Sequence, residues 1–111
     1  MSLEQEHVID AIGIDRETGH IVLTIADSWD WADKNGHLLA LQAKINAYLE
    51  FIESKQINDA VPGASEKPIT IDIVTKYPMP ISGIELLEKT HSVASDLNVT
   101  VSHRHLPVVT P

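Results

Sequence analysis

Alternating apolar and polar residues divide the chain into predicted strands separated by turns and helices. Strands are predicted where β-branched and apolar residues cluster between turn signals, over residues 8–15, 20–26, 69–75 and 99–105. The first two are joined by the turn Arg16-Glu17-Thr18-Gly19, in which Gly19 can adopt a positive φ. A connection this short predicts an antiparallel hairpin.

The segment between the second and third predicted strands has helical periodicity. Apolar residues recur there every three or four positions over residues 34–54 and form one stripe: Leu38, Leu41, Ile45, Tyr48 and Ile52. Asp33 is expected to cap the first turn of this helix. Residues 55–67 contain Pro62-Gly63 and are predicted to be a loop.

A second helix is predicted over residues 83–97. Ser82 and Glu85 have the spacing of a capping box, and Ile81 and Leu86 can close a hydrophobic staple around it. Asn98 is expected to end this helix, because asparagine tolerates the left-handed conformation that follows many helices.

Only one face of each later strand is strongly apolar, so both helices are expected to cover the same face of the sheet. Right-handed crossovers then require the sheet order 1-2-3-4, with the last three strands parallel. The predicted fold is therefore an α+β two-layer sandwich of order ββαβαβ, with a four-stranded mixed sheet and two helices on one face. Residues 1–111 are expected to form a single globular domain.

Composition narrows the classes of function. The 111 residues include no cysteine, which excludes disulfides, thiolate zinc sites and cysteine nucleophiles. No apolar run approaches the ~20 residues of a membrane-spanning helix. The N-terminus is polar, unlike a signal peptide, so we expect a cytoplasmic protein without a membrane partner.

Acidic residues are concentrated in the first third of the chain. The formal net charge is −8, which argues against a nucleic-acid partner. Residues 1–35 hold eight acids and two bases, a net charge of −6, and residues 36–111 hold the remaining −2. This charge can simply keep the protein soluble, or it can steer a cation or a basic protein partner.

The loop after the second strand is the most unusual segment. Asp27, Asp30 and Asp33 recur every third residue and bracket Trp29 and Trp31. An EF-hand alignment fails, because its first and twelfth positions fall on residues that are not carboxylate ligands. We interpret the aspartates as helix caps and the tryptophans as anchors over the core, with a weak divalent-ion site as the alternative.

Two histidines near the end of the last strand are the second candidate. His103 and His105 lie two residues apart, so both point to the same face. The carboxyl ends of parallel strands meet at one edge of the sheet, where Asp27, Trp29 and Tyr77 could join them. An Asp–His pair there could perform acid–base chemistry or bind a metal. The alternative is a pair of histidines at a partly hydrated strand end.

Parts of the chain resemble a known family. The segment Asp27-Ser-Trp-Asp-Trp, the helix that follows over residues 37–54, and Ile71-Asp-Ile-Val-Thr-Lys-Tyr-Pro are similar to a family of small bacterial proteins known only as a domain of unknown function. Family members often have glycine where this chain has Lys55. The resemblance implies a bacterial, cytosolic, single-domain protein and brings no activity, cofactor or catalytic residue.

The sequence favours a non-catalytic binding or protein-interaction module. It contains no glycine-rich phosphate loop, no nucleophile elbow and no zinc-protease motif, so we assign no catalytic residue, metal or cofactor. The candidate binding residues are Asp27, Trp29, Asp30, Trp31, Tyr77, His103 and His105. The alternative is a small metal-dependent or acid–base hydrolase that uses the Asp27 and His103 edge cluster. A homodimer is also expected, through the open sheet face or an edge strand.

Overall fold

Four strands form one mixed sheet in the computed structural model, which describes residue 3 and residues 5–106. They are β1 (Ala11–Ile14), β2 (Ile21–Asp27), β3 (Ile69–Thr75) and β4 (Val99–His105), in the spatial order β1-β2-β3-β4. β1 is antiparallel to β2, whereas β2, β3 and β4 are parallel. The predicted α+β fold and sheet order are therefore confirmed.

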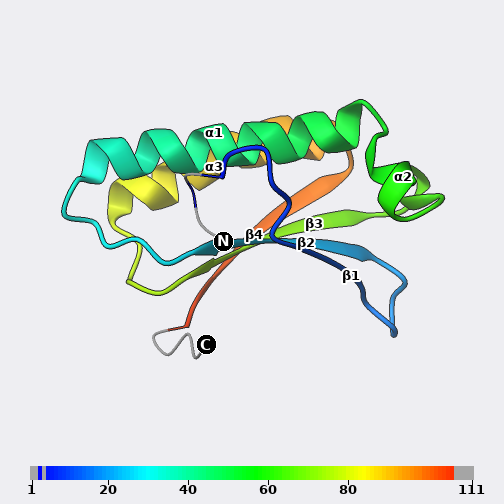
Figure 1. Cartoon of the computed structure of the whole chain (residues 1–111), viewed down its shortest axis with the longest axis horizontal. Helices are drawn as coiled ribbons and strands as arrows, with labels where there is room; N and C mark the ends of the chain where they lie inside the picture. The colour runs from blue at the N-terminus through cyan, green and yellow to red at the C-terminus, as the bar shows by residue number, and fades with distance from the viewer. Residues whose placement is uncertain (1–2, 4, 107–111) are drawn as a thin grey trace.

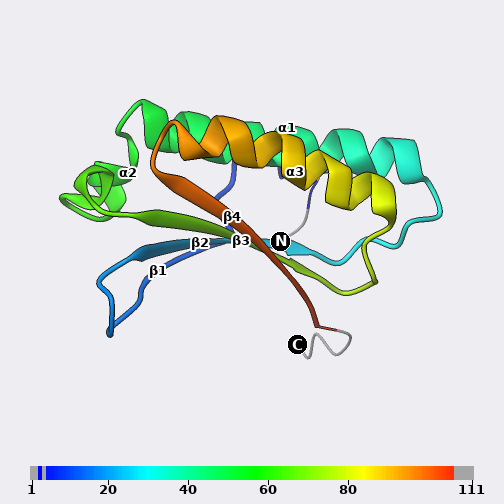
Figure 2. The same cartoon turned by 180° about the vertical axis from the view of Figure 1, so that it is seen from behind.

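Two long helices lie on the same face of this sheet (Figures 1 and 2). α1 spans Lys34–Glu53 and α3 spans Ile81–Ser95. The prediction that residues 55–67 form a plain loop is wrong, because this segment contains the short helix α2 (Ile57–Ala60) and the 3-10 turn η1 (Ala64–Glu66). The reason is apolar burial: Ile57 and Ala64 are both fully buried in a segment that is otherwise mostly polar.

The core lies between α1 and the inner face of β2 and β3. Ile45, in the middle of the predicted stripe, is 1% exposed. Isoleucine and leucine alternate inward on the two central strands, and their buried members are Ile21, Leu23, Ile25, Ile69, Ile71 and Ile73. α3 contributes less to the core, since its buried residues are Gly83 and Ala94.

The start of α3 differs from the prediction. Pro80, rather than a residue after Ile81, occupies the N-cap position, and its carbonyl accepts hydrogen bonds from the amides of Gly83 and Ile84. Ser82 therefore lies inside the first turn, its hydroxyl has no partner among the described residues, and the predicted capping box is wrong. The staple is also wrong, because Ile81 is 78% exposed.

Two non-glycine residues adopt the left-handed conformation where helices end. Lys55 follows α1 with φ 65°, and Asn98 precedes β4 with φ 60°. α3 ends at Ser95, two residues before the predicted end, and Asn98 adopts the predicted left-handed conformation in the turn that leads to β4. Lys55 occupies the kind of position that glycine fills without steric strain.

The segment before β1 is fixed by a buried polar cluster rather than by strand pairing. The Lys44 ammonium donates to the Asp10 carboxylate at 3.0 Å and to the Gln5 carbonyl at 2.8 Å. The Tyr48 hydroxyl accepts from the Asp10 amide and donates to the Thr24 carbonyl. Because these contacts occupy Asp10, β1 begins at residue 11 and is shorter than the predicted strand over 8–15.

The outer face of the sheet carries a charged pair near its centre. The Arg104 guanidinium contacts the Asp72 carboxylate at 2.8 Å, and the Ser102 hydroxyl donates to the same carboxylate. Asp72 is thus paired with Arg104.

Candidate functional site

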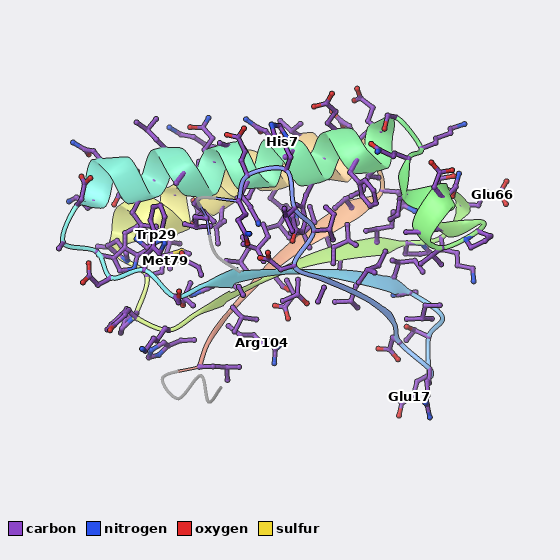
Figure 3. The ribbon with its side chains drawn as sticks, in the orientation of Figure 1. His7, Glu17, Trp29, Glu66, Met79 and Arg104 are labelled. Atoms are coloured by element: carbon purple, nitrogen blue, oxygen red, sulfur yellow. The ribbon has the colours of Figure 1, made fainter. Side chains whose placement is uncertain are left out.

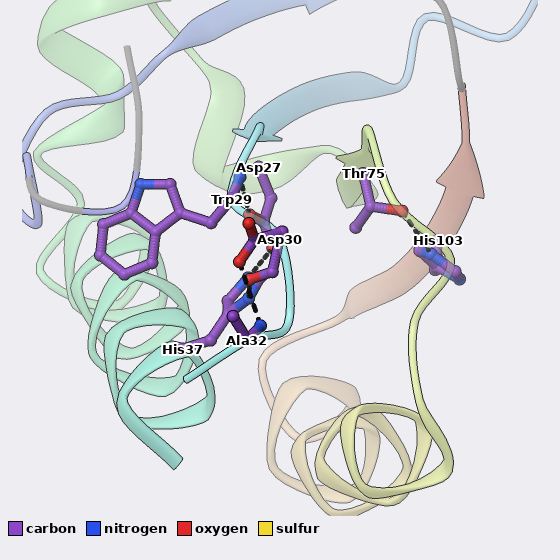
Figure 4. A network of polar contacts seen from close by, with 7 residues as sticks. All are labelled: Asp27, Trp29, Asp30, Ala32, His37, Thr75 and His103. Carbon is purple, nitrogen blue, oxygen red and sulfur yellow. Dashed lines mark hydrogen bonds and ion pairs between the residues drawn. The ribbon is translucent and has the colours of Figure 1, made fainter. Parts of the chain in front are cut away.

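A buried aspartate–histidine pair joins the end of β2 to the first turn of α1. Asp27 is the last residue of β2 and shares the inward face with Ile25, and His37 lies one turn before Leu41 on the buried side of α1. The His37 Nε2 and the Asp27 Oδ2 are 2.5 Å apart, with the two side chains 1% and 0% exposed. Figure 4 shows this pair beside the loop that connects the two elements.

Both ring nitrogens of His37 are occupied. Its Nδ1 lies 2.8 Å from the carbonyl oxygen of Asp30, which can only accept, so Nδ1 carries a hydrogen. One further proton is shared between Nε2 and the Asp27 carboxyl, either as imidazolium with carboxylate or as imidazole with carboxylic acid. In neither form does His37 present a free nitrogen lone pair to a substrate.

Burial also affects the acid of this pair. Desolvation raises the pKa of Asp27, and the hydrogen bond and positive charge of His37 oppose this rise. The Trp29 amide donates to the other carboxylate oxygen at 3.1 Å, which also favours the charged form. The cost of burial outweighs these contacts, so the pKa of Asp27 lies above its usual value.

The two tryptophans surround the His37 ring. The Trp31 indole stacks on the imidazole with centroids 3.5 Å apart and 13° between the planes. Trp29 approaches the same ring edge-on at 5.6 Å. Both indoles also pack against the core, which confirms that the tryptophans anchor the loop.

The remaining aspartates of the loop make local hydrogen bonds. The Asp33 carboxylate accepts from the Gly36 amide at 3.1 Å and caps α1, as predicted. A side chain at Gly36 would collide with this carboxylate, so glycine permits the cap. The Asp30 carboxylate accepts from the Ala32 amide at 3.0 Å, which closes a turn before the helix rather than the helix end itself.

A pocket of about 390 Å³ opens beside this loop. Its lining consists of Ser28, Trp29, Asp30, Asp33 and His37. Two exposed carboxylates and an aromatic ring thus meet in one concave surface, while the Asp27 carboxylate lies buried behind it. Within the described residues, no group of three or more histidine, aspartate or glutamate side chains is arranged to hold a metal ion.

Both predicted histidines lie on β4, which β3 separates from β2. The His103 Nε2 is 3.1 Å from the Thr75 hydroxyl, and Thr75 is the β3 residue in register with Asp27 (Figure 4). Burial lowers the pKa of His103, and the charge of His105 lowers it further. His105 is exposed, and its Nε2 lies 3.2 Å from the Lys76 carbonyl oxygen.

The structure therefore brings together only part of the predicted set. Asp27, Trp29, Asp30 and Trp31 surround His37, whereas His103 approaches this group through Thr75. Tyr77 is 39% exposed at the outer rim, where its ring lies 5.7 Å from the Lys76 ammonium.

Sequence reasoning missed His37. The signal was its spacing: positions 37, 41, 45, 48 and 52 continue the buried stripe of α1 by one turn. A polar residue on a buried stripe requires a polar partner. The inward-facing end of the preceding strand is the nearest place in the fold that can supply one. That reasoning leads to Asp27.

The fold and the pocket define a small α+β protein with an acid-lined, aromatic-walled pocket beside a buried Asp–His pair. The chain belongs to DUF6572, a family of unknown function whose model matches residues 1–107. No curated protein and no solved structure matches the chain. None of the described helices is long and apolar enough to cross a membrane.

Proposed function

We propose that the protein is a non-catalytic binding module that accepts a cationic side chain of a basic protein partner. The observation that carries this proposal is the lining of the pocket, where Asp30, Asp33 and Trp29 face one concave space. Carboxylates attract a lysine or arginine side chain, and an indole face adds a cation–π contact.

The local hydrogen bonds leave acceptor capacity in the pocket. Asp30 and Asp33 each use Oδ1 for a backbone amide, so the second oxygen of each carboxylate is open to an incoming cation. The loop that carries them is fixed at both ends by the buried Asp27–His37 pair. A preorganised loop loses little conformational entropy when a ligand binds.

The same contacts weigh against the hydrolase alternative. A general base needs a free lone pair within reach of the substrate, and both nitrogens of His37 are occupied. Thr75, whose hydroxyl lies 3.1 Å from His103 Nε2, is 1% exposed and therefore sheltered from a substrate. These observations support binding rather than catalysis as the role of the site.

The proposal is tested by titrating the ¹⁵N-labelled protein with hexaarginine and hexalysine peptides, with hexaglutamate as a peptide control. Amide shifts are expected to concentrate on residues 28–37. The Asp30→Asn/Asp33→Asn variant should bind about tenfold more weakly or worse. Both substitutions keep the Oδ1 acceptors, so the loop and the cap are retained.

A matched variant separates pocket binding from general attraction. Glu17→Gln/Glu66→Gln removes the same two charges at the opposite end of the molecule from Trp29 (Figure 3), and we expect it to bind like the wild type. Equal weakening in both variants would show that net charge alone attracts the peptide, and the proposed site would then be wrong.

A further inference from the structure

The edge strand β1 has an unguarded free edge. All four of its residues, Ala11–Ile14, are exposed, and none of them is charged or proline. Ile12 is 36% and Ile14 52% exposed, although both share the helix-side face with Leu23 and Ile21 of β2. Edge strands of this kind are usually protected by charge, proline or a bulge, because they otherwise template pairing with another strand.

The hydrogen-bond pattern shows which backbone groups face outward. The Asp15 amide donates to the His20 carbonyl, so odd-numbered residues of β1 bond inward to β2. The amides and carbonyls of Ile12 and Ile14 therefore point to the free edge, where none of the described hydrogen bonds occupies them. The Asp10 amide, by contrast, already donates to the Tyr48 hydroxyl.

We propose that β1 pairs antiparallel with β1 of a second copy, so that two sheets join into one of eight strands. The outward amide and carbonyl of Ile12 then bond to the carbonyl and amide of Ile14 in the second copy. The outward groups of Ile14 bond in the same way to Ile12 of the second copy, and the twofold axis passes between the two Gly13 residues. This register uses the two residues with open backbone groups and excludes Asp10, whose amide is occupied.

The side chains of β1 fit the same register. Ile12 and Ile14 face each other across the interface on the helix side, which covers apolar surface that one chain leaves exposed. Gly13 falls at the close, non-hydrogen-bonded position, and space around it is open.

The flanking acids do not obstruct this pairing. The Asp10 carboxylate is held by Lys44 and by the Ala26 amide, and the Asp15 carboxylate accepts from the amides of Glu17 and Thr18. Both carboxylates are thus bound within their own chain. The edge lies away from the pocket at Trp29, so this inference does not depend on the proposed function (Figure 3).

The test is sedimentation velocity of the pure protein from micromolar to millimolar concentration. We expect a species of twice the 12.2 kDa chain mass that grows with concentration. Ile14→Pro removes only an outward amide, which an edge strand tolerates, and should weaken dimerisation about tenfold or more. Val93→Lys changes an exposed apolar residue on α3 and should leave dimerisation unchanged.

Hydrogen exchange of the wild-type protein gives a readout that does not depend on the variant folding. The amides of Ile12 and Ile14 should become protected as concentration rises, and the amide of Gly13 should be protected throughout. A chain that stays monomeric at millimolar concentration would overturn the proposal. So would a dimer in which the Ile12 and Ile14 amides still exchange freely.

Discussion

The indole of Trp31 lies flat on the imidazole of His37, with 3.5 Å between the ring centroids. The Trp31 indole covers one side of the buried Asp27–His37 pair, and β2 and α1, which carry the two residues, enclose it on the other. The stack holds the imidazole ring in the plane that places its Nε2 against the Asp27 carboxyl. The loop is therefore held at one point by a hydrogen bond and by ring stacking.

Removal of His37 should destabilise the protein strongly. His37→Ala leaves the Asp27 carboxylate buried without its partner, which costs ~3–5 kcal/mol for pairs of this kind. The double variant Asp27→Asn/His37→Ala should be more stable than His37→Ala alone, because an amide is less costly to bury than a charge. Urea unfolding measures both values. A double variant less stable than the single one would contradict the pairing.

The raised pKa of Asp27 predicts a specific pH dependence. A carboxyl whose folded pKa exceeds its unfolded value of about 3.9 binds more protons in the folded state. Asp27 therefore contributes its full stabilisation at pH values below its pKa in the unfolded chain. That stabilisation is lost as the pH rises through its pKa in the folded protein.

Asn at position 27 imitates the neutral carboxyl at every pH. The wild type should therefore lose stability relative to Asp27→Asn as pH rises from acidic to neutral. Urea unfolding of both proteins across that range gives the difference directly. Parallel curves for the two proteins would mean that the pKa of Asp27 is not raised.

The cap at Asp33 predicts how its variants behave. Asp33→Ala removes the acceptor for the Gly36 amide and should cost ~0.5–2 kcal/mol. Asp33→Asn should cost little, since asparagine caps about as well.

Melting curves with millimolar calcium, magnesium, manganese or zinc should match a control of equal ionic strength. A metal-specific rise in midpoint that Asp33→Asn abolishes would instead identify a cation site in this loop.

The strained end of α1 offers a stabilising substitution. Lys55 is exposed and has φ 65°, a conformation that costs a side-chain-bearing residue roughly 1–2 kcal/mol. Lys55→Gly should therefore raise the free energy of unfolding by ~0.5–1 kcal/mol, after the greater freedom of glycine in the unfolded chain is deducted.

Lys67 provides the matched control for this substitution. It is also exposed, but its φ is −111°, so Lys67→Gly should be slightly destabilising. Thermal or urea unfolding of both variants tests the sign of each effect. A loss of stability in Lys55→Gly would show that the lysine is not strained there.

The fold was predictable because its determinants are local and repetitive. The apolar residues of β2 and β3 alternate without interruption, and the right-handed crossover rule then leaves one sheet order.

The start of α3 was not predictable from Ser82 and Glu85 alone. Pro80 has no amide hydrogen to satisfy and a fixed φ, so it takes the cap position two residues earlier.

The site was predictable only in its loop. Asp27, Trp29, Asp30 and Trp31 stand out by spacing, but the residue that organises them lies on the helix. His37 and Lys44 both occupy the buried stripe of α1, and each is compensated by an aspartate outside the helix, Asp27 for His37 and Asp10 for Lys44. Periodicity identifies the buried face, whereas the partner of a buried polar residue depends on the tertiary structure.

Burial of Lys44 also has a chemical consequence. Its ammonium is 0% exposed, whereas the other five lysines of the chain are exposed. An amine-acylating reagent should therefore modify five lysines quickly and reach the sixth only when the segment around Gln5 and Asp10 detaches from α1. The rate of that last acylation, read by mass spectrometry, would be a built-in reporter of local opening at the amino-terminal end of the sheet.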